Sequence, residues 1–538
     1  MMQMSDSRAR DVLAVLVLML GAAVITFLFV TPWLPAPLKM VRFTALADPA
    51  PIFAGIIILA TLLLGRKVVR RPSLSMIFLA VAAAAVLPFG VIFRAFGQVD
   101  MMAFLFHAQA GIAGVSPEML RSHILATLFA LMGLILICYL ASSVRGMRLL
   151  PLLAGVMLVL FHPYVIYQAK RLLLPVPDVD LAAQVVVPEI AANPLSPDIV
   201  YFYLEGMDRR FLDPALGPET ASILRTLEDQ GLSFTNIREV AGTGWSIAGY
   251  VASQCGVPLL PQGNLANDII ESIGERFLPG VTCLGDLLAE RGYQQTFVMG
   301  AEGKFAGTVA FFVTHRYQKT IAQKDMAALF PPDELKKASV VWFSDDQMVY
   351  DVARREFSEA LGQKSPFLLT LATIGPHGVP NYLSRQCTED GQAVFTDDVF
   401  RAAHCLMEMT AQLVADLQEE HRRSGRPNEL RIILQSDHLN HARHLLPSDA
   451  ELKVNTVILI GGAEKGVTNA RPGTMLDVFP TLLDWLGFPV AGGKAGLGVS
   501  LLSPGMGDSL LDTWDLAMLD RIMMSNIPMF EKLWEGSH

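Results

Sequence analysis

Long apolar runs are concentrated in the first third of the chain. Most approach the roughly 20 residues that a helix needs to cross a bilayer. No A-x-A-like cleavage site follows the first run, and further runs come behind it, so a cleaved signal peptide is disfavoured. We therefore predict a five-helix transmembrane anchor over residues 1–167, with spans at about 12–30, 49–65, 75–94, 123–142 and 149–167.

Basic residues predict how this anchor is oriented. They precede the first run and follow the second and the fourth, at Arg8, Arg10, Arg66, Lys67, Arg70, Arg71, Arg145 and Arg148. Because cytoplasmic loops carry an excess of Lys and Arg, the N-terminus is expected in the cytoplasm and the chain beyond residue 170 outside it. Between the third and fourth spans, MMAFLFHAQAGIAG (101–114) is too short to cross and predicts an interfacial or re-entrant segment.

A different pattern follows the anchor. Residues 168–197 are rich in Pro and short apolar bursts, which is typical of an extended linker. Beyond them, short and mostly continuous apolar runs predict strands that are buried on both faces. These strands are expected at 199–205, 295–300, 367–373, 430–435 and 455–462. Helices are expected between them at 217–231, 283–292, 350–362, 398–425 and 474–487.

Alternating strands and helices indicate an α/β domain over residues 198–504, with a mainly parallel sheet and helices on both faces. Residues 505–538 are expected to form a C-terminal tail. In such a fold the ligand site lies at the carboxyl ends of the strands.

Composition adds two constraints. The net charge of −9 argues against a nucleic-acid partner, which favours a basic surface. Of five cysteines, four lie in the exported part, at Cys255, Cys283, Cys387 and Cys405. An even set in an oxidising compartment suggests two disulfides, most simply Cys255 with Cys283 and Cys387 with Cys405, although four cysteines allow three connectivities.

Polar residues that directly follow the predicted strands are the candidates for chemistry. Glu205 ends the first strand, His377 follows the third, and Asp437 and His438 follow the fourth. Each alone has an ordinary interpretation as a strand end, a turn or a helix cap, but together they suit a Mn²⁺, Mg²⁺ or Zn²⁺ site. His441 and His444 could extend this site, although a solvated helix start is favoured.

The stretch GTGWSIAG places two hydroxyls, Thr243 and Ser246, before a helical run. It is one residue short of the G-x-S-x-G elbow of lipases, but that interpretation leaves Glu205 unused. Alternatively, Ser246 begins the helix and faces the metal, which would lower the pKa of its hydroxyl. Thr243 is then a turn residue. Conversion of Ser246 to formylglycine, as in sulfatases, requires a following x-P-x-R that this sequence lacks.

Several blocks of the sequence carry a family resemblance. They are YLEGMDRRFLD, FTNIREVAGTGWSIAGYVASQCGVPL, CLGDLLAERGYQQTFVMGAEGKFAG, LTLATIGPHG, LQSDH and MLDVFPTLLDWLGF. With the multi-span anchor, they resemble membrane-anchored members of the alkaline phosphatase and sulfatase superfamily. The branch in question holds lipoteichoic acid synthases, phosphoethanolamine transferases and the phosphoglycerol transferases of osmoregulated periplasmic glucans.

The resemblance implies roles for individual residues. Glu205, Ser246, Asp437 and His438 would bind the metal, Mn²⁺ or else Zn²⁺ or Mg²⁺, and Ser246 would also be the nucleophile. Relatives usually carry Thr at that position, so Ser246 is a conservative departure. His377 would contact the substrate phosphate or glycerol. An Arg expected near the phosphoglycerol is not obvious in GKFAGTVAFFVTHRY, where His315 or Arg316 would take its place.

The implied activity is transfer of phosphoglycerol from phosphatidylglycerol to glucosyl hydroxyls of periplasmic glucans through a covalent serine intermediate, at the Gram-negative inner membrane. Phosphoethanolamine transfer and glycerolphosphate polymerisation are the alternatives within the same fold. A membrane sensor or scaffold with a degenerate domain is the non-enzymatic alternative, but it would be expected to lack one or more of the four ligands.

Overall fold

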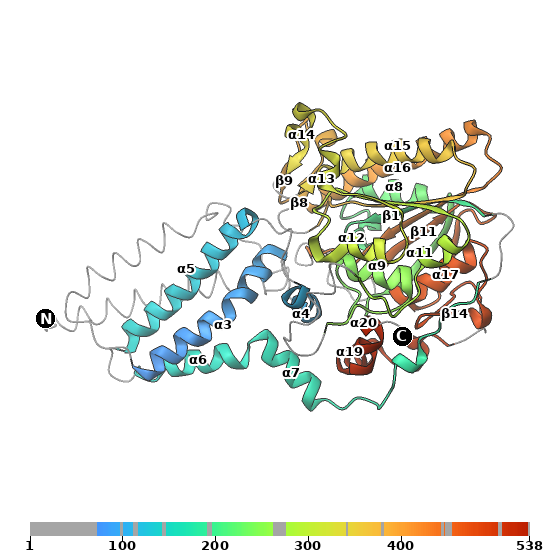
Figure 1. Cartoon of the computed structure of the whole chain (residues 1–538). Helices are drawn as coiled ribbons and strands as arrows, with labels where there is room; N and C mark the ends of the chain where they lie inside the picture. Colours follow the sequence, from blue (N-terminus) through green and yellow to red (C-terminus); the bar gives the residue numbers. More distant parts are fainter. Residues whose placement is uncertain are drawn as a thin grey trace, which may run out of the picture. The chain divides into compact units, whose positions relative to one another are not determined.

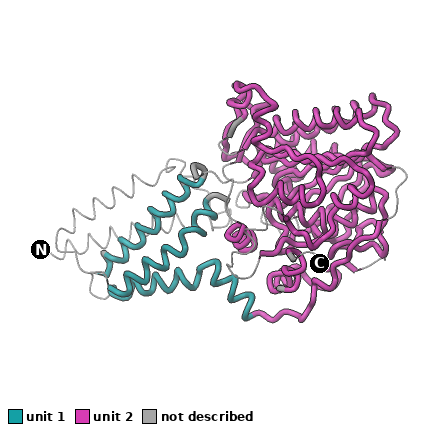
Figure 2. Tube along the Cα trace, viewed as in Figure 1, with its two compact units in different colours: residues 1–99, 117–173 teal, residues 100–116, 174–538 magenta. Residues whose placement is uncertain are grey.

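The computed structural model describes residues 73–96, 100–110, 117–142, 147–190, 196–261, 276–340, 343–377, 381–442, 446, 454–503 and 508–535. The chain forms two compact units (Figure 2). Unit 1 comprises residues 1–99 and 117–173, and unit 2 comprises residues 100–116 and 174–538.

The described part of unit 1 is helical. Its helices are α3 (Leu74–Phe96), α5 (Pro117–Ser142), α6 (Leu150–Leu160) and α7 (Pro163–Leu173). They coincide with the third, fourth and fifth predicted spans, whereas the spans predicted at 12–30 and 49–65 lie outside the described residues.

Of the three predicted spans that fall within the described residues, the structure supports one or two as membrane crossings. Within the described residues, only Leu74–Arg94 is a single helix long and apolar enough to span a bilayer. Helices α6 and α7 would together make a second span, but they are bent by 56° at their junction. Pro163 begins α7, and because proline lacks an N–H and clashes with the preceding turn, the helix breaks there. A five-helix anchor is therefore not confirmed.

Helix α4 (Met101–Ala110) belongs to unit 2, although the sequence places it between two predicted spans (Figure 2). The ring of Phe106 lies 6.0 Å from that of Trp245 and 6.2 Å from that of Phe277, centroid to centroid. The ring of His107 stacks on Phe305 at 5.6 Å. The segment predicted to be interfacial or re-entrant thus packs against the residue that precedes Ser246.

The centre of unit 2 is a mainly parallel sheet, as predicted. Its order across the described residues is β12-β2-β11-β10-β1-β7-β3-β4, and β13 pairs with β2. The strands are β1 (Asp198–Leu204), β2 (Gly231–Arg238), β3 (Gln294–Met299), β4 (Lys319–Ile321), β7 (Phe367–Ala372), β10 (Leu430–Ser436), β11 (Asn455–Ile460), β12 (Val467–Asn469) and β13 (Gly473–Thr474).

Several features of this sheet differ from the sequence prediction, and the short strands β4, β12 and β13 were not predicted. Strand β11 runs antiparallel to both β10 and β2. Strand β2 was not predicted, because polar residues such as Ser233 and Thr235 interrupt its apolar positions and leave no continuous apolar run. All seven residues of β1, at the centre, are buried.

Helices cover both faces of the sheet (Figure 1). One face carries α8 (Pro218–Glu228), α15 (Asp346–Leu361) and α16 (Val399–Ser424), and the other carries α9 (Ser246–Cys255), α11 (Leu284–Glu290), α12 (Thr308–Thr314) and α17 (Val478–Trp485). The largest apolar core lies between the sheet and the first group of helices. The five predicted helices are confirmed, with α17 beginning four residues later than expected.

Two disulfides form in unit 2, with the simplest of the three possible pairings. Cys255 bonds to Cys283, and Cys387 bonds to Cys405. Because Cys255 ends α9 and Cys283 is the N-cap of α11, the first disulfide joins two helices on the same face. Cys138 is free and buried.

The predicted linker and tail contain regular structure. Helix α7 extends to Leu173, and Val186 and Ile190 form bridges with Gly496 and Val490. Within the tail, α18 (Leu510–Thr513), α19 (Leu516–Ser525) and α20 (Ile527–Glu535) belong to unit 2.

Candidate active site

Two neighbouring parallel strands bring the candidate ligands together. Leu204 at the end of β1 pairs with Ser436 at the end of β10. Glu205 and Asp437 are the next residues on the two strands and so lie side by side. His438 follows directly, and all three side chains are buried, with at most 3% of their surface exposed.

The polar atoms of these residues converge on one point. Nε2 of His438 lies 3.2 Å from Oε1 of Glu205 and 3.3 Å from Oδ2 of Asp437. Ligand atoms from the three residues all lie within 4.8 Å of one another. The hydroxyl of Ser246 lies 3.4 Å from Oε2 of Glu205 and 3.4 Å from Nε2 of His438.

The donor set fits a divalent cation. Oε1 of Glu205 and Oδ2 of Asp437 are buried and have no hydrogen-bond donor. Oδ1 of Asp437 accepts from the backbone N–H groups of Gly206 and His438, both at 2.9 Å, so the carboxylate is held with Oδ2 toward the site. Nδ1 of His438 lies 2.9 Å from the carbonyl of Leu439. Since that carbonyl can only accept a hydrogen bond, Nδ1 carries a proton, and Nε2 is the nitrogen that would bind a metal.

The charges of the cluster also indicate a site for a cation. Burial, and then the negative charge of Asp437, raises the pKa of Glu205 to about 8. Burial by itself lowers the pKa of His438, but the carboxylates of Asp437 and Glu205 raise it to about 10. The two carboxylates therefore hold positive charge between them, and a metal ion would take the place of the proton.

Helix α9 supplies the nucleophile candidate. Ser246 is its first residue and is half-buried, so the hydroxyl lies at the positive end of the helix dipole. The helix can approach the loop that carries Asp437 and His438, called the ligand loop below, because residue 249 is glycine. A Cβ on Gly249 would lie 1.8 Å from the carbonyl oxygen of Asp437.

This geometry does not fit the lipase alternative. In a Ser-His-acid triad the two imidazole nitrogens face the serine and the acid separately. Here Nε2 of His438 faces Ser246 and both carboxylates, while Nδ1 faces a carbonyl. The histidine therefore sits as a metal ligand would, not as a relay between serine and acid.

Two further imidazoles lie at the same strand ends. The ring of His441 lies 4.3 Å from that of His438 and 6.0 Å from that of His377, centroid to centroid. His441 is 9% exposed, so the expectation of a solvated helix start is wrong for this residue. Burial, with a smaller effect from His438, lowers the pKa of His377 to about 4. His444 lies outside the described residues.

Other sequence candidates lie elsewhere. The hydroxyl of Thr243 donates to the carbonyl of Val240 at 2.8 Å, which confirms it as a turn residue. Nδ1 of His315 lies 2.8 Å from Asp286, and this histidine is close to the Cys255–Cys283 disulfide. Cys255 ends α9 and Ser246 begins it, about 13 Å apart at 1.5 Å per residue.

The placement of His315 and its neighbour therefore does not support contacts to phosphoglycerol. Arg316 has 51% of its side chain exposed and lies 3.6 Å from Glu290, the last residue of α11. His315 lies at the Cys255 end of α9 and Arg316 lies beside the end of α11, so neither placement supports a contact near Ser246.

Several residues that orient the ligand loops were not foreseen. Asp208, fully buried, accepts from the guanidinium of Arg210 and, at 2.9 Å, from the backbone N–H of Asn440. The amide of Asn440 donates to the carbonyl of Pro376 at 2.6 Å, beside His377. Glu239 accepts from the backbone N–H of Leu439 at 2.5 Å. The sequence signal for these residues is that polar positions continue beyond Glu205, at Asp208 and Arg210, and beyond His438, at Asn440.

The class of protein follows from a mainly parallel sheet, helices on both faces, and a hydroxyl beside buried carboxylates and an imidazole at the strand ends. The Sulfatase family profile matches residues 212–488, just over half of the chain. The chain therefore belongs to the sulfatase family.

Among curated relatives, the chain is similar to two proteins named phosphoglycerol transferase I. It is 30% identical over 325 residues to that of Xanthomonas campestris pv. campestris (strain B100), covering 59% of this chain and 45% of the relative. It is 28% identical over 335 residues to that of Escherichia coli (strain 55989 / EAEC), covering 61% of this chain and 42% of the relative. The chain thus spans less than half the length of these relatives.

Solved structures with similar folds include an alkaline phosphatase superfamily protein from Vibrio parahaemolyticus. Its TM-score is 0.46 at 16% identity, over 70% of this chain and 97% of that one. A lipoteichoic acid synthase from Listeria monocytogenes has a TM-score of 0.44 at 14% identity, over 60% of this chain and 80% of that one.

Proposed function

We propose that this protein transfers phosphoglycerol from phosphatidylglycerol to a hydroxyl of a periplasmic glucan and releases diacylglycerol. The observation that carries the proposal is the position of Ser246, at the start of α9 and 3.4 Å from both Glu205 and His438. A hydroxyl beside a metal-ligand cluster at a helix N-terminus suits attack on a phosphate ester. The name of the relatives supports phosphoglycerol as the transferred group.

In the proposed reaction, Glu205, Asp437, His438 and Ser246 hold a divalent cation, Mn²⁺ or else Zn²⁺ or Mg²⁺. Such an ion lowers the pKa of a coordinated hydroxyl and neutralises charge on phosphate oxygens. The Ser246 hydroxyl passes its proton to water and attacks the phosphorus, forming an Oγ–P bond while the P–O bond to diacylglycerol breaks. The diacylglycerol oxygen takes a proton from water, and His377, neutral because of its low pKa, donates a hydrogen bond to the substrate.

The second step reverses the first. An acceptor hydroxyl attacks the phosphorus, its O–P bond forms, and the Oγ–P bond breaks. The acceptor hydroxyl loses its proton, and Oγ of Ser246 takes up a proton and becomes a hydroxyl again. Two in-line displacements leave the configuration at phosphorus unchanged.

We also propose where the reaction takes place. The apolar helices and flanking basic residues support a multi-pass protein of the Gram-negative inner membrane with a cytoplasmic N-terminus. Two disulfides in unit 2 support a periplasmic location for the site, because disulfides persist in oxidising compartments.

The test supplies the purified full chain with Mn²⁺ and phosphatidylglycerol labelled in the headgroup. Peptide mass spectrometry should find a glycerophosphoryl adduct on Ser246, and the Ser246→Ala variant should form no adduct and release no diacylglycerol. The conservative Ser246→Thr variant retains a hydroxyl and should retain activity.

Three results would contradict the proposal. An adduct on Thr243, or turnover that survives Ser246→Ala, would refute the nucleophile. Turnover that a chelator leaves unchanged would refute the metal. Preference for phosphatidylethanolamine over phosphatidylglycerol as donor would replace phosphoglycerol transfer with phosphoethanolamine transfer.

A further inference from the structure

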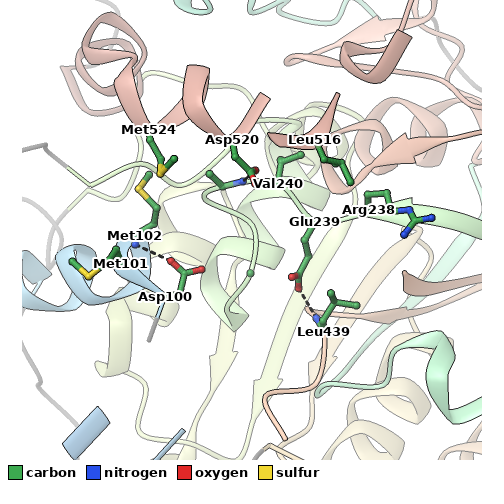
Figure 3. Close-up of a pocket in the computed structure, with 12 residues that line it drawn as sticks. Asp100, Met101, Met102, Arg238, Glu239, Val240, Leu439, Leu516, Asp520 and Met524 are labelled. Carbon is green, nitrogen blue, oxygen red and sulfur yellow. Dashed lines mark hydrogen bonds between the residues drawn. The ribbon is translucent and has the colours of Figure 1, made fainter. Parts of the chain in front are cut away.

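A cavity of about 400 Å³ lies beside the segments that precede Ser246 and follow His438. Figure 3 shows residues that line it. Its wall includes Gly244, two residues before Ser246, and Leu439, the residue after His438. The start of α4, the end of β2 with the loop that follows it, and α19 complete the wall. All of these elements belong to unit 2. A cavity of this size accommodates a small ligand.

The described residues that line the cavity carry a net negative charge. They include three carboxylates, from Asp100, Glu239 and Asp520, and one guanidinium, from Arg238. Burial, with smaller effects from Asp100 and Glu239, raises the pKa of Asp520 to about 6. An excess of carboxylates repels phosphate and the headgroup of an anionic lipid. The charge therefore favours a neutral or cationic ligand over the phosphate of a donor.

Backbone groups hold each carboxylate in position. Oδ1 of Asp520 accepts from the N–H of Ala241 at 2.7 Å, and Oδ1 of Asp100 accepts from the N–H of Met102 at 2.8 Å. Glu239 accepts from Leu439, as described above. A carboxylate has about four lone-pair sites, so an oriented group of this kind also accepts hydrogen bonds from ligand hydroxyls.

The opposite chemistry lines the same cavity. Met101 and Met102 of α4 and Met524 of α19 contribute apolar, adaptable side chains, and Figure 3 shows Met102 and Met524 close together on one side. Acceptors of O–H hydrogen bonds beside an apolar wall match a sugar ring, which presents hydroxyls at its rim and C–H groups on its faces.

We infer that this cavity is the acceptor subsite, and that it binds a neutral polyhydroxyl compound such as a glycosyl unit. The inference rests on the proposed function and deepens it. One hydroxyl of the bound sugar reaches the phosphorus on Ser246. The bond between the sugar oxygen and phosphorus forms as the Oγ–P bond breaks. The sugar hydroxyl loses its proton, and Oγ of Ser246 takes up a proton. Water competes for the same intermediate and would yield free glycerol phosphate.

The experiment measures how the full-length enzyme divides phosphoglycerol between a glucoside acceptor and water. Asp520→Asn keeps the shape of the side chain but removes its charge. It should lower the ratio of transfer to hydrolysis about tenfold, as loss of a charged hydrogen bond does, and raise the KM for the glucoside. Met524→Ala should shift the ratio in the same direction. The KM for phosphatidylglycerol should not change.

Asp515→Asn is the matched control. Asp515 is the N-cap of the same helix, and Asn can accept the same backbone hydrogen bond as Asp does there. Asp515 is not among the residues that line the cavity. Thermal unfolding of all variants checks that they fold. Unchanged partitioning in both Asp520→Asn and Met524→Ala overturns the inference. A rise in the KM for phosphatidylglycerol with unchanged partitioning assigns the cavity to the donor and also overturns it.

Glucoside binding to the inactive Ser246→Ala variant separates this inference from the proposed function. Saturation-transfer NMR should show binding that Asp520→Asn weakens. If the wild-type enzyme releases no diacylglycerol, the proposed function fails, while binding that depends on Asp520 still supports a polyhydroxyl site. If Asp520→Asn leaves glucoside binding unchanged, the cavity is not the acceptor subsite.

Discussion

At the scale of single residues, the site is defined by buried oxygens without donors. Oε1 of Glu205 and Oδ2 of Asp437 are such oxygens, and both face Nε2 of His438. A buried, unpaired carboxylate is costly, so an arrangement that places two together requires a compensating positive charge. We propose that a cation bound by these three residues and Ser246 provides it.

Glu205→Gln tests this explanation through stability, independently of activity. Mn²⁺ at 100 times its Kd should stabilise the wild-type protein by about 2.7 kcal/mol, because it binds only the folded state. The variant loses a charged ligand, so Mn²⁺ should raise its unfolding midpoint much less. The measurement is thermal unfolding with and without chelator, together with the metal content of the purified protein.

Glu219→Gln serves as the control, since Glu219 has 80% of its side chain exposed and lies in the first turn of α8, not at the strand ends. It should respond to Mn²⁺ as the wild type does. Equal stabilisation of Glu205→Gln and the wild type would show that Glu205 is not a ligand.

At the scale of elements, the position of α9 determines whether its first residue can act. Its start lies against the Asp437 loop, and its end is joined to α11 by the Cys255–Cys283 disulfide. Closing a loop of this length stabilises a protein by about 2–4 kcal/mol. The helix is thus held at both ends, and Gly249 provides the close approach at the ligand loop.

Gly249→Ala should displace this loop. Its Cβ would lie 1.8 Å from the carbonyl of Asp437, so helix and loop must separate. We expect a loss of about 1–3 kcal/mol in the free energy of unfolding, typical of overpacking, and a large fall in kcat. Denaturant unfolding and diacylglycerol release measure the two effects.

Gly362→Ala is the comparison for this prediction. Gly362 has an ordinary φ of −75°, and the nearest atom to its added Cβ would be 3.4 Å away. This change should leave stability and activity nearly unaltered. If Gly249→Ala behaves in the same way, close contact between α9 and the ligand loop is not needed.

At the scale of the whole molecule, the two compact units do not follow the order of the chain. Residues 100–116 leave unit 1 and join unit 2, where Phe106 of α4 packs near Trp245 and Phe277. The segment between predicted membrane spans therefore forms part of the unit that contains Ser246. A fragment that begins after residue 173 would lack α4.

Phe106→Ala tests how much α4 contributes. Phe106 is 1% exposed, so its truncation should cost about 3–5 kcal/mol and lower activity, because Trp245 precedes Ser246. Phe395→Ala, at a phenylalanine that is 43% exposed, should cost much less. Unfolding of the full chain by denaturant compares them. Equal effects would mean that α4 only rests on the surface of unit 2.

The sequence predicted the local features of this molecule well. Continuous apolar runs identified β1, β3, β7 and β10, since a strand buried on both faces leaves a clear signal in composition. The rule that ligands gather at strand ends located Glu205, Asp437 and His438. Each of these conclusions depends on residues close together in the chain.

Features that depend on distant contacts were missed. The antiparallel direction of β11 and the pairing of β2 depend on which strands become neighbours, which the runs themselves do not specify. His315 and Arg316 were assigned by their position in a motif, but His315 lies beside the Cys255–Cys283 disulfide and Arg316 beside Glu290, so their contact with phosphoglycerol stays a prediction. His441 was expected to be solvated, but it is buried, because its exposure depends on the surrounding fold.

The amino-acid sequence alone therefore established the α/β class, the apolar N-terminal region and the set of candidate ligands, because these depend on local composition and order. Only the tertiary structure decided that His438 faces both carboxylates through one nitrogen, and that α4 and α19 form a cavity beside Ser246. The reason is physical: the distances that make a site come from packing between segments hundreds of residues apart, and no local pattern specifies them.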